Sequence, residues 1–532
     1  LESLQEVRQA LQLTDKQLMQ DKIEVPAYRM LYLDETLQEN AMMEVIRDVS
    51  FASRIEKLQN PDFEKEYVPD SLKGILREYQ KAGAAWIGML YSNRFGGILA
   101  DDMGLGKTLQ VISFLLTEHT GCSLIVCPAS LVYNWKHELE RFAPSLKADM
   151  VTGNVQQRKE VLDRWKEVDV LITSYDLLRR DITDYQELHF FCEVIDEAQY
   201  IKNHGTQAAR AVKQVQTGFR LALTGTPIEN RLSELWSIFD YLMPGYLYSY
   251  QRFRIELEQP IVQHKDEDAA KRLQRLIRPF VLRRLKKEVL QDLPDKLEEN
   301  LYADMDGEQQ ELYDAHVRRM KLMLEEKSDE EIRTDKIEIL AELTRLRQLC
   351  CDPALLYDNY KGGSAKTELV RGLIRNAVEN GHKVLLFSQF TTMLERLYRI
   401  LEEEKIASHM LTGATPKEKR IEMVESFAHD DVPVFCISLK AGGTGLNLTA
   451  ADVVIHFDPW WNSAVQNQAT DRAHRIGQKN VVNVYRILAK GTIEEKIVEL
   501  QERKLQLSDR ILGGESLQAQ GLTREELLEL LR

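Results

Sequence analysis

The sequence predicts an α/β protein built from two doubly wound parallel-sheet lobes with helical insertions. Short apolar runs rich in β-branched residues alternate with helical stretches over two separate parts of the chain. Between those parts the strand rhythm is lost, and the sequence becomes helical and charged. The length of 532 residues exceeds what one hydrophobic core normally serves, so we expect two or three domains.

The alternation of apolar runs with helical stretches, and its absence elsewhere, divides the chain into four segments. We expect a helical tail of an upstream domain, or a brace, over residues 1–65, the first lobe over 66–285, the second lobe over 286–500, and a helical brace and tail over 501–532. Helical insertions are expected near 245–290 and at about 305–360. Because the chain starts at Leu1 rather than at methionine, we expect it to be a fragment of something longer.

The strands of both lobes are expected where the apolar runs lie. These runs are residues 97–100, 124–127, 168–173, 191–195 and 220–224 in the first lobe, and 383–387, 434–438, 452–456 and 481–485 in the second. In such sheets, ligands bind beyond the carboxyl ends of the strands. The unusual residues of this chain follow these runs one after another, so we expect the functional site there.

The segments between and after the lobes carry weaker signals. Residues 278–287 hold five basic residues in ten, which indicates an interlobe tether, with a contact to nucleic-acid phosphates as the alternative. Residues 325–338 are expected to form an exposed helical protrusion. Residues 492–495 form a capping box before a helix that we expect to end at Gly513, and a last short amphipathic helix is expected from Thr523.

Composition narrows the functional classes. With a net charge of -14, any nucleic-acid site must be a local patch. No apolar run approaches the roughly 18 residues of a membrane span. The six cysteines show no zinc-binding spacing, which favours buried thiols in a reducing compartment. The adjacent pair Cys350 and Cys351 leaves a redox role open.

A phosphate-binding loop is indicated directly after the first apolar run. The segment from Asp101 to Thr108 places two glycines before Lys107 and Thr108, and a helical stretch follows. Glycines let backbone N–H groups approach phosphate oxygens, and the helix N-terminus favours negative charge. Lys107 would reach the β- and γ-phosphates, and the Thr108 hydroxyl would ligate Mg²⁺. Asp101 stands where the usual pattern has its first glycine.

An acidic pair follows the run at 191–195. Hydrolysis of a nucleotide needs one carboxylate for Mg²⁺ and a second group to orient or deprotonate water. We assign Asp196 to the metal and Glu197 to the water. A solvated acidic pair at a strand end is the alternative, and the preceding phosphate-binding loop favours the catalytic interpretation.

Three further motifs have the composition of ligand-binding loops. Residues 223–227 combine hydroxyl groups with glycine at a strand end, and residues 438–447 combine three glycines with Lys440. Arg472 and Arg475 are spaced i, i+3, so on a helix they would share one face and could clamp a γ-phosphate. A surface salt-bridge face is the alternative for this pair.

The whole series of motifs, in this order, resembles the Swi/Snf-type ATPases of helicase superfamily two. The resemblance covers roughly residues 70–510, and its most specific part is the segment 472–478. It implies two RecA-like lobes, with ATP in the cleft between them and double-stranded DNA across the top. The short insertions resemble a compact bacterial or archaeal member rather than a nucleosome remodeller.

The resemblance also implies roles for individual residues. Catalytic roles are implied for Lys107, Glu197, Arg472 and Arg475, and Mg²⁺ ligands are Thr108 and Asp196. Nucleotide contacts are implied for Arg77, Gln80 (as the adenine reader), Asp102, Met103, Gly104, Leu105, Gly106, Lys107, Thr108, Leu109, Gly445 and Arg475. DNA contacts are implied for Ser130, Asn134, Trp135, Thr173, Ser174, Tyr175, Ser388, Gln389, Thr412, Gly413, Lys440, Gly442, Gly443 and Thr444. Coupling between the two sites is implied for Gln199, Thr224, Gly225, Thr226, Trp460, Trp461 and Gln468.

Three positions depart from the family pattern. Gln199 stands where many members carry histidine, although an amide can still bridge the γ-phosphate and the opposite lobe. Ser463 replaces a proline, and Gln466 replaces a glutamate. We therefore expect the coupling around residues 460–468 to differ in detail.

The expected function is ATP-dependent translocation on double-stranded DNA that remodels or displaces DNA-bound protein. A strand-separating helicase on RNA or DNA is the alternative, and an ATP-gated binding platform is the third. The expected cofactors are ATP and Mg²⁺, and the expected partners are DNA and a DNA-bound protein such as RNA polymerase. We expect a monomer in the cytoplasm, associated with the nucleoid if bacterial.

Overall fold

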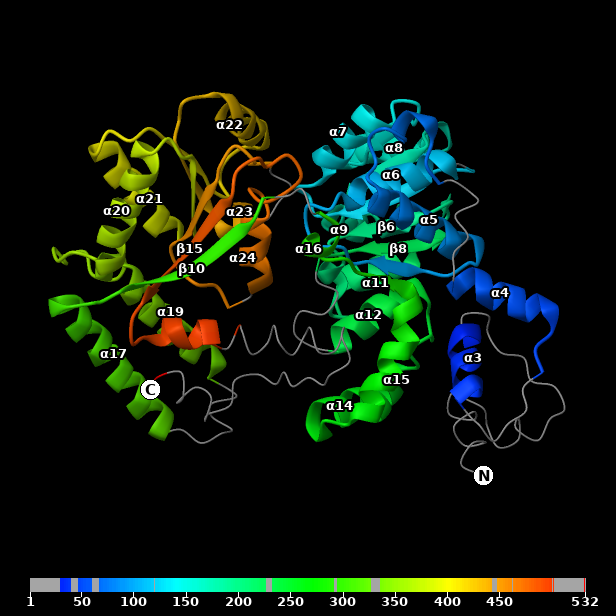
Figure 1. Cartoon of the computed structure of the whole chain (residues 1–532), viewed down its shortest axis with the longest axis horizontal. Coiled ribbons are helices and arrows are strands. Elements are labelled where there is room, and N and C mark those ends of the chain that lie inside the picture. Colours follow the sequence, from blue (N-terminus) through cyan, green and yellow to red (C-terminus); the bar gives the residue numbers. More distant parts are fainter. Residues whose placement is uncertain are drawn as a thin grey trace. The chain divides into compact units, whose positions relative to one another are not determined.

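The computed structural model describes residues 29–39, 46–59, 67–118, 120–225, 232–290, 294–326, 335–442, 447–461, 463–499, 501 and 531. These residues divide into two compact units that part between Val289 and Leu290. Each unit is organised around its own parallel sheet, which confirms the predicted α/β fold class (Figure 1).

The first unit contains a sheet of seven parallel strands. In spatial order these are β3 (Ala148–Met150), β4 (Val170–Ser174), β2 (Ser123–Cys127), β6 (Glu193–Asp196), β8 (Arg220–Leu223), β1 (Gly97–Leu99) and β9 (Val281–Leu282). β5 (His189–Phe190) and β7 (Gln216–Thr217) form a separate parallel pair. Each apolar run expected in this lobe forms a strand, because a parallel sheet covered on both faces needs apolar residues on both.

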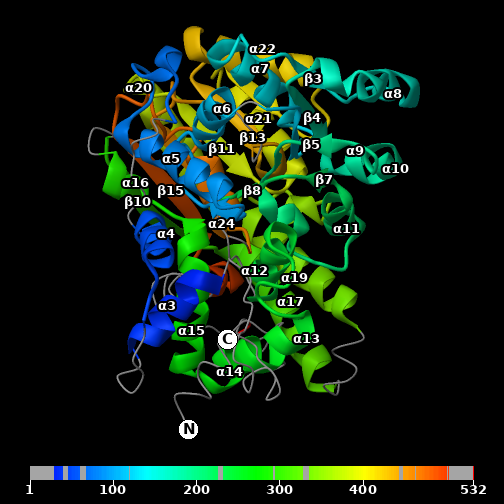
Figure 2. The same cartoon turned by 90° about the vertical axis from the view of Figure 1, so that its right-hand side faces the viewer.

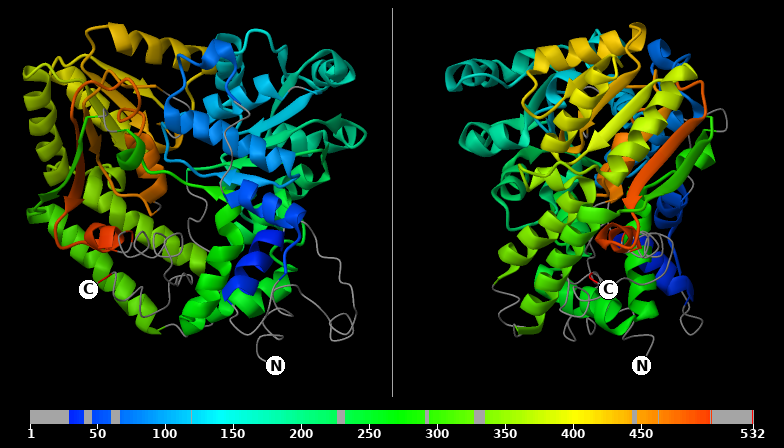
Figure 3. Two further views of the ribbon diagram at one scale, coloured as in Figure 1. Left: turned by 45° about the vertical axis from the view of Figure 1, so that its right-hand side comes forward. Right: turned by 90° about the vertical axis from the view of Figure 1, so that its left-hand side faces the viewer.

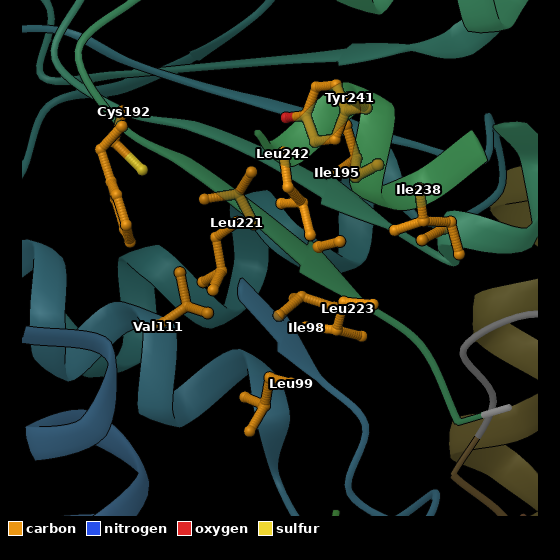
Figure 4. Packing of buried hydrophobic residues seen from close by; sticks show 14 of the residues in the cluster. Ile98, Leu99, Val111, Cys192, Ile195, Leu221, Leu223, Ile238, Tyr241 and Leu242 are labelled. Carbon is orange, nitrogen blue, oxygen red and sulfur yellow. The ribbon is translucent and has the colours of Figure 1, made fainter. Parts of the chain in front are cut away.

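Helices cover both faces of this sheet. The helices of this unit, not all of which lie on the sheet, are α3 (Met30–Glu39), α4 (Val49–Gln59), α5 (Glu78–Ser92), α6 (Lys107–Thr117), α7 (Val132–Phe142), α8 (Val155–Asp163), α9 (Tyr175–Arg180), α10 (Ile182–Tyr185), α11 (Gln207–Gln214), α12 (Leu232–Leu242), α13 (Tyr250–Phe253), α14 (Gln259–His264), α15 (Glu267–Ile277) and α16 (Lys286–Val289). α5, α6 and α7 pack on one face, and α9, α11 and α12 pack on the other (Figure 1). Figure 4 shows Val111 of α6 and Ile238 of α12 in one core with Leu99, Leu221 and Leu223 of the strands.

The second unit contains a sheet of six parallel strands. In spatial order these are β10 (Lys296–Ala303), β15 (Val482–Ala489), β14 (Val453–His456), β11 (Val384–Ser388), β13 (Val434–Ser438) and β12 (Ser408–Leu411), with β10 beside β15 in Figure 2. The helices around it are α20 (Ala365–Glu379), α21 (Thr391–Glu403), α22 (Lys417–His429), α23 (Leu439–Gly442) and α24 (Ser463–Thr470). Ile374 of α20 and Leu394 of α21 belong to one core cluster, and Phe427 of α22 and Ala469 of α24 belong to another. The two clusters show that helices cover both faces here as well.

A helical pair extends from the second unit within the expected protrusion. α17 (Gly307–Glu326) and α19 (Lys336–Cys351) lie side by side (Figure 3). Their apolar faces share a core cluster with Ile493 and Ile497, from the helical residues 493–499. The stretch 325–338 is described only in part. The expected end at Gly513 and the helix from Thr523 lie outside the described residues.

The charged middle of the chain contains two strands that the sequence analysis did not expect. β9 pairs in parallel with β1, with Ile98 opposite Val281. β10 pairs over its whole length with β15. The interpretation of residues 278–287 as a tether is therefore wrong for the part that forms β9 and the turn after it, which is built into the first unit. Among the helices that the structure describes, none is both long and apolar enough to cross a membrane.

Candidate functional site

The loop between β1 and α6 has the geometry of a phosphate-binding loop. Gly104 and Gly106 have left-handed backbone angles, φ 85° and φ 74°, which favour glycine. Gly106 is the N-cap of the eleven-residue helix α6, so the unpaired N–H groups of the helix start face the loop. The Lys107 ammonium donates hydrogen bonds to the carbonyl oxygens of Asp101 at 2.6 Å and Asp102 at 3.4 Å. The loop therefore presents a cation and backbone donors together, as an anion site requires.

The carboxylate of Asp196 ends β6 and is oriented by two donors. Its Oδ2 accepts from Trp135 Nε1 at 2.9 Å, and its Oδ1 accepts from the Glu197 N–H at 2.8 Å. Burial first, and then the charge of Glu197, raise the pKa of Asp196, while the nearby charge of Lys107 lowers it. Leu99 at the end of β1 and Asp196 at the end of β6 both lie opposite Leu223 of β8, so the phosphate-binding loop and the acidic pair follow the same edge of the sheet.

A chain of hydrogen bonds leads from Glu197 to the end of β8. Glu197 has a left-handed backbone (φ 53°), which is rare for a residue with a side chain. Its Oε2 accepts from Gln199 Nε2 at 2.7 Å, and Gln199 Oε1 accepts from the Thr224 hydroxyl at 3.1 Å. The next residue, Gly225, leaves room for Met103, because a Cβ at Gly225 would lie 2.8 Å from Met103 Cε. The motif at residues 223–225 is therefore connected both to the acidic pair and to the phosphate-binding loop.

Gln80 and Arg77 lie behind the same loop. The Gln80 side chain is buried, and its Nε2 donates to the Leu105 carbonyl oxygen at 3.1 Å. Its Oε1 accepts from the Arg77 N–H at 2.9 Å, at the start of α5. In this structure, Gln80 thus holds the backbone of the phosphate-binding loop; its role as adenine reader stays a prediction.

Burial separates the side chains expected to contact DNA into two groups. Trp135, Thr173, Ser174, Tyr175 and Ser388 are buried, whereas Ser130, Asn134, Gln389, Thr412 and Gly413 are partly or fully exposed. Trp135 bonds the Asp196 carboxylate, and the Tyr175 hydroxyl donates to the Asp196 carbonyl oxygen at 2.8 Å. Because their side chains are covered by protein, the buried group offers no surface to DNA in this structure. Trp135 and Tyr175 instead support the strand that carries the acidic pair.

The second unit organises its own motifs around Asp458. Asp458 Oδ1 accepts from the Ser388 hydroxyl at 2.6 Å and from the Gln389 N–H at 3.2 Å. Burial raises the pKa of Asp458, and the charge of Arg347 opposes this. Arg347 of α19 also donates to the Pro459 carbonyl oxygen. The helical protrusion is therefore attached to the loop that carries Trp460.

Both tryptophans of that loop pack on the same guanidinium. Arg347 Cζ lies 5.8 Å from the ring centroid of Trp460 and 5.7 Å from that of Trp461. The Gln466 amide oxygen accepts from the Trp460 N–H and from Gln501 Nε2, both at 3.2 Å. Where many family members are expected to carry glutamate, the neutral side chain of Gln466 thus still fixes the loop.

Arg472 and Arg475 do not lie on a helix. α24 ends at Thr470, and residues 471–477 form turns, so the expectation of a shared helical face is wrong. The turns are held by Gln478, whose Nε2 donates to the carbonyl oxygens of Thr449, Ala451 and Ala473. Backbone hydrogen bonds such as that from the Ala473 N–H to the Thr470 carbonyl oxygen remain, and the Gln478 side chain ties these turns to residues 449–451. Of the remaining expected residues, Lys440 and Gly442 have their backbones in α23, and Gln468 is buried in α24. The residues that lie outside the described part of the chain are Thr226, Gly443, Thr444 and Gly445.

The site fits a magnesium–nucleotide complex. In the described ranges, no group of three or more His, Cys, Asp or Glu side chains is arranged around a metal ion. Mg²⁺ bound together with phosphates needs only one or two carboxylates, and the rest of its shell comes from phosphate and water. The partly buried carboxylate of Asp196, beside that of Glu197, is a place where a divalent cation would relieve repulsion between like charges.

Sequence reasoning missed two arginines. Arg284 pairs with Asp101 of the phosphate-binding loop, and Arg347 pairs with Asp458. Each lies more than 100 residues from its partner, in a segment that was interpreted only as helical or charged. The one available signal was Asp101 itself, since a buried carboxylate needs a cation.

Three family models match the chain. The SNF2-related domain matches residues 79–355, the helicase conserved C-terminal domain matches residues 365–477, and the domain described as bacterial SNF2 helicase associated matches residues 1–69. The chain belongs to the SNF2 family. The resemblance to Swi/Snf-type ATPases is thereby confirmed, and the third match agrees with its expected bacterial character.

Several curated proteins are similar to this SNF2 chain. An ATP-dependent helicase of Mycoplasma genitalium, MG018, is 41% identical over 86% of the chain and 44% of its own length. YwqA of Bacillus subtilis, described as an ATP-dependent helicase/translocase, is 40% identical over 87% of the chain and 51% of its own length. The TATA-binding protein-associated factor MOT1 of Saccharomyces cerevisiae is 33% identical over 90% of the chain and 30% of its own length. The chain thus spans about half the length of the bacterial relatives.

A solved structure is also similar. It is that of the Sulfolobus solfataricus SWI2/SNF2 ATPase core in complex with double-stranded DNA, which is 37% identical to this chain. The likeness covers 82% of this chain and 93% of that one, with a TM-score of 0.42.

Proposed function

We propose that this SNF2 chain hydrolyses ATP to move along double-stranded DNA and so remodels or displaces DNA-bound protein. The observation that supports this most strongly is the assembly of three strand ends in the first unit. β1, β8 and β6 are neighbours in the sheet, so Lys107 after β1, the pair Asp196 and Glu197 at β6, and Thr224 after β8 lie at one edge, where Gln199 joins Glu197 to Thr224 by hydrogen bonds. A network of this composition suits phosphoryl transfer, which depends on positioning and on charge stabilisation.

Each residue of the candidate site has its own role in the proposed hydrolysis of ATP. Lys107 and the N–H groups at the start of α6 bind the β- and γ-phosphates, and Asp196 and Thr108 hold Mg²⁺. The bound metal neutralises charge that develops on the phosphates. Glu197 orients and deprotonates the attacking water, and its bond to Gln199 fixes the direction of the carboxylate. Arg475 of the second unit supplies positive charge to the γ-phosphate when the two units close on the nucleotide.

Membership of the SNF2 family supports double-stranded DNA as the substrate, and the related Sulfolobus solfataricus SWI2/SNF2 ATPase core has been solved in complex with double-stranded DNA. The partly exposed group around Ser130, Asn134, Gln389 and Thr412 would contact phosphates, because a translocase must pass over any sequence. A protein target on the DNA is supported by MOT1, which is named for its association with the TATA-binding protein. We place the protein in the cytoplasm, as a monomer on chromosomal DNA.

A strand-separating helicase is the second candidate, because the bacterial relatives are named helicases. The two functions differ in what happens to the duplex. A translocase moves along intact double-stranded DNA, whereas a helicase releases one strand.

The test combines ATPase rates with two displacement assays. We expect hydrolysis to be stimulated strongly by double-stranded DNA and weakly by single-stranded DNA or RNA. We also expect ATP-dependent release of a third strand from a DNA triplex, without release of a duplex strand. Unwinding of a tailed duplex would favour the helicase, and ATP binding without turnover on any nucleic acid would favour the binding platform.

A further inference from the structure

Arg284 reaches the phosphate-binding loop from a distant part of the sequence. It follows β9, whereas Asp101 follows the neighbouring strand β1. Arg284 Nε donates to Asp101 Oδ1 at 2.9 Å, and Nη2 donates to Oδ2 at 2.5 Å. The Asp101 side chain is 0% exposed and that of Arg284 is 13% exposed. A bidentate, buried pair of this kind fixes both the position and the orientation of the carboxylate.

Gln110 and Gly83 complete this cluster. Gln110 Nε2 donates to Asp101 Oδ2 at 3.1 Å, and Gln110 Oε1 accepts from Arg284 Nη2 at 2.8 Å. A Cβ at Gly83 would lie 1.8 Å from Gln110 Oε1 and 2.8 Å from Arg284 Nη2. The glycine in α5 therefore leaves the room that the cluster occupies.

The same guanidinium is connected to the other end of the loop through Tyr79. It donates to the Tyr79 carbonyl oxygen, and its Cζ lies 5.2 Å from the centroid of the Tyr79 ring. The Tyr79 hydroxyl donates to the Leu105 carbonyl oxygen at 3.0 Å, beside the bond from Gln80. One connected set of contacts thus holds the loop at both Asp101 and Leu105.

We propose that Arg284 is a positioning residue for the nucleotide, acting through Asp101 and Tyr79. Holding both ends of the loop keeps its backbone in the shape that presents Lys107 and the N–H groups to a phosphate chain. The role also explains why aspartate stands where a phosphate-binding loop usually has glycine: the carboxylate is the attachment point. The inference rests on the proposed ATP-binding function.

The expected effect is on nucleotide affinity more than on turnover. A loop released from Arg284 samples other shapes, and the apparent dissociation constant rises as the competent fraction falls. If that fraction drops to about one tenth, KM for ATP rises about tenfold. Bound nucleotide restores the loop, so kcat should change by less than about threefold, with the loss confined to the binding step. A merely structural role would instead lower kcat through loss of folded protein, at unchanged KM.

The experiment measures kcat and KM with saturating duplex DNA, and the dissociation constant of a fluorescent ATP analogue. The variants are Arg284→Ala, Arg284→Lys, Asp101→Asn and the double variant Arg284→Ala/Asp101→Asn. Arg254→Ala, which removes an exposed arginine from the same unit, is the control and should match the wild type. Arg284→Lys should be intermediate, because an ammonium can pair with Asp101 but lacks the planar fork. The double variant should be little worse than Arg284→Ala, because both substitutions remove the same contact.

A folded Arg284→Ala protein with unchanged KM and unchanged analogue affinity overturns the proposal, as do additive effects in the double variant. If Arg284→Ala does not fold, Arg284→Lys and Asp101→Asn decide by the same two measurements. A wild-type protein that neither binds nor hydrolyses ATP refutes the proposed function instead, so the two failures are distinguishable.

Discussion

Trp135 Nε1 donates a hydrogen bond of 2.9 Å to Oδ2 of Asp196. This bond lowers the pKa of a carboxyl that burial raises, and so favours the ionised form that a metal ion needs. Replacing Trp135 by phenylalanine removes the donor and keeps an aromatic ring in the core. We expect the acid limb of the ATPase pH profile to move upward by about one pH unit, the equivalent of one hydrogen bond.

The affinity for DNA is the second measurement on the Trp135→Phe variant. It should stay unchanged, because the indole ring is buried. Trp165→Phe, at a partly buried tryptophan of the same unit, is the control. An unchanged pH profile with a loss of DNA affinity would restore the DNA-contact role that the sequence indicated.

Glu197→Gln should bind Mg²⁺-ATP yet turn over at least about 100-fold more slowly, since removal of a general base typically costs this much. The substitution leaves Asp196 for the metal and retains an oxygen that can accept from Gln199. Analogue binding and single-turnover hydrolysis check the two halves of the expectation. Lys107→Ala is the comparison: it should lose hydrolysis and stay folded without ATP, with only a small loss of thermal stability from its two hydrogen bonds to loop carbonyl oxygens. Near-normal turnover in Glu197→Gln would remove Glu197 from water activation.

Arg475→Ala should bind ATP through the first unit and bind DNA, but lose basal and DNA-stimulated hydrolysis. An arginine finger contributes about 10³ to 10⁵ in rate. Arg475→Lys should restore little, because a point charge lacks the planar fork. Single-turnover hydrolysis with and without duplex DNA is the measurement. If Arg475→Ala keeps the DNA-stimulated rate to within about tenfold, the loss is far smaller than an arginine finger gives. That result would favour Arg472 as the arginine finger.

Lys440→Ala should weaken DNA binding equally for all sequences. The plot of log affinity against log salt concentration should lose about one unit of slope, as expected when one phosphate contact is removed. Titrations over several salt concentrations, with two unrelated duplexes, provide the test. Lys361→Ala, at an exposed lysine of the same unit, is the control. A strong sequence preference in the wild type would contradict the translocase assignment itself.

Glu193 predicts a pH dependence of stability. It lies fully buried at the start of β6, and burial raises its pKa from 4.5 to about 8. Between these values the folded protein keeps a proton that the unfolded chain releases. Stability therefore falls as pH rises through this window, by up to about 1.4 kcal/mol per pH unit from this group. Glu193→Gln should reduce the fall in melting temperature between pH 5 and 8. Glu187→Gln, at an exposed glutamate of the same unit, is the control and should behave as the wild type. Equal slopes of melting temperature against pH in the wild type and both variants would contradict the raised pKa of Glu193.

The secondary structure could be predicted from the sequence wherever a local pattern of apolar residues decides it. Runs such as 434–438 were predicted as strands because a short apolar run that includes β-branched residues is typical of a strand covered on both faces, and this run forms β13 (Val434–Ser438). The residues of the candidate site could likewise be named from the sequence, because Lys107 and Asp196 belong to short motifs. Pattern did not reveal β9, whose two residues are too short to show a period and are held by pairing with β1.

The sequence also did not show whether a motif residue is buried or lies on a helix. Trp135 and Arg475 were identified from type and spacing, but burial and helix ends depend on contacts with distant segments. The Trp135 ring donates to Asp196 at the end of β6, and the chain forms turns after Thr470 that the Gln478 side chain ties to residues 449–451. Such contacts are specified by the whole fold rather than by a window of residues.

The anchoring of Asp101 by Arg284 bears on how the protein matures during synthesis. The two residues are 183 positions apart, so the phosphate-binding loop leaves the ribosome long before its anchor exists. At about 5 to 20 residues per second, roughly 10 to 40 s pass before Arg284 is made. A nascent chain that stops short of β9 would carry every residue of the first unit that we propose to bind ATP, and still have an unanchored loop. If Arg284 anchors the loop as proposed, the full affinity for the nucleotide is reached only when β9 joins β1, so this affinity depends on completion of the first sheet.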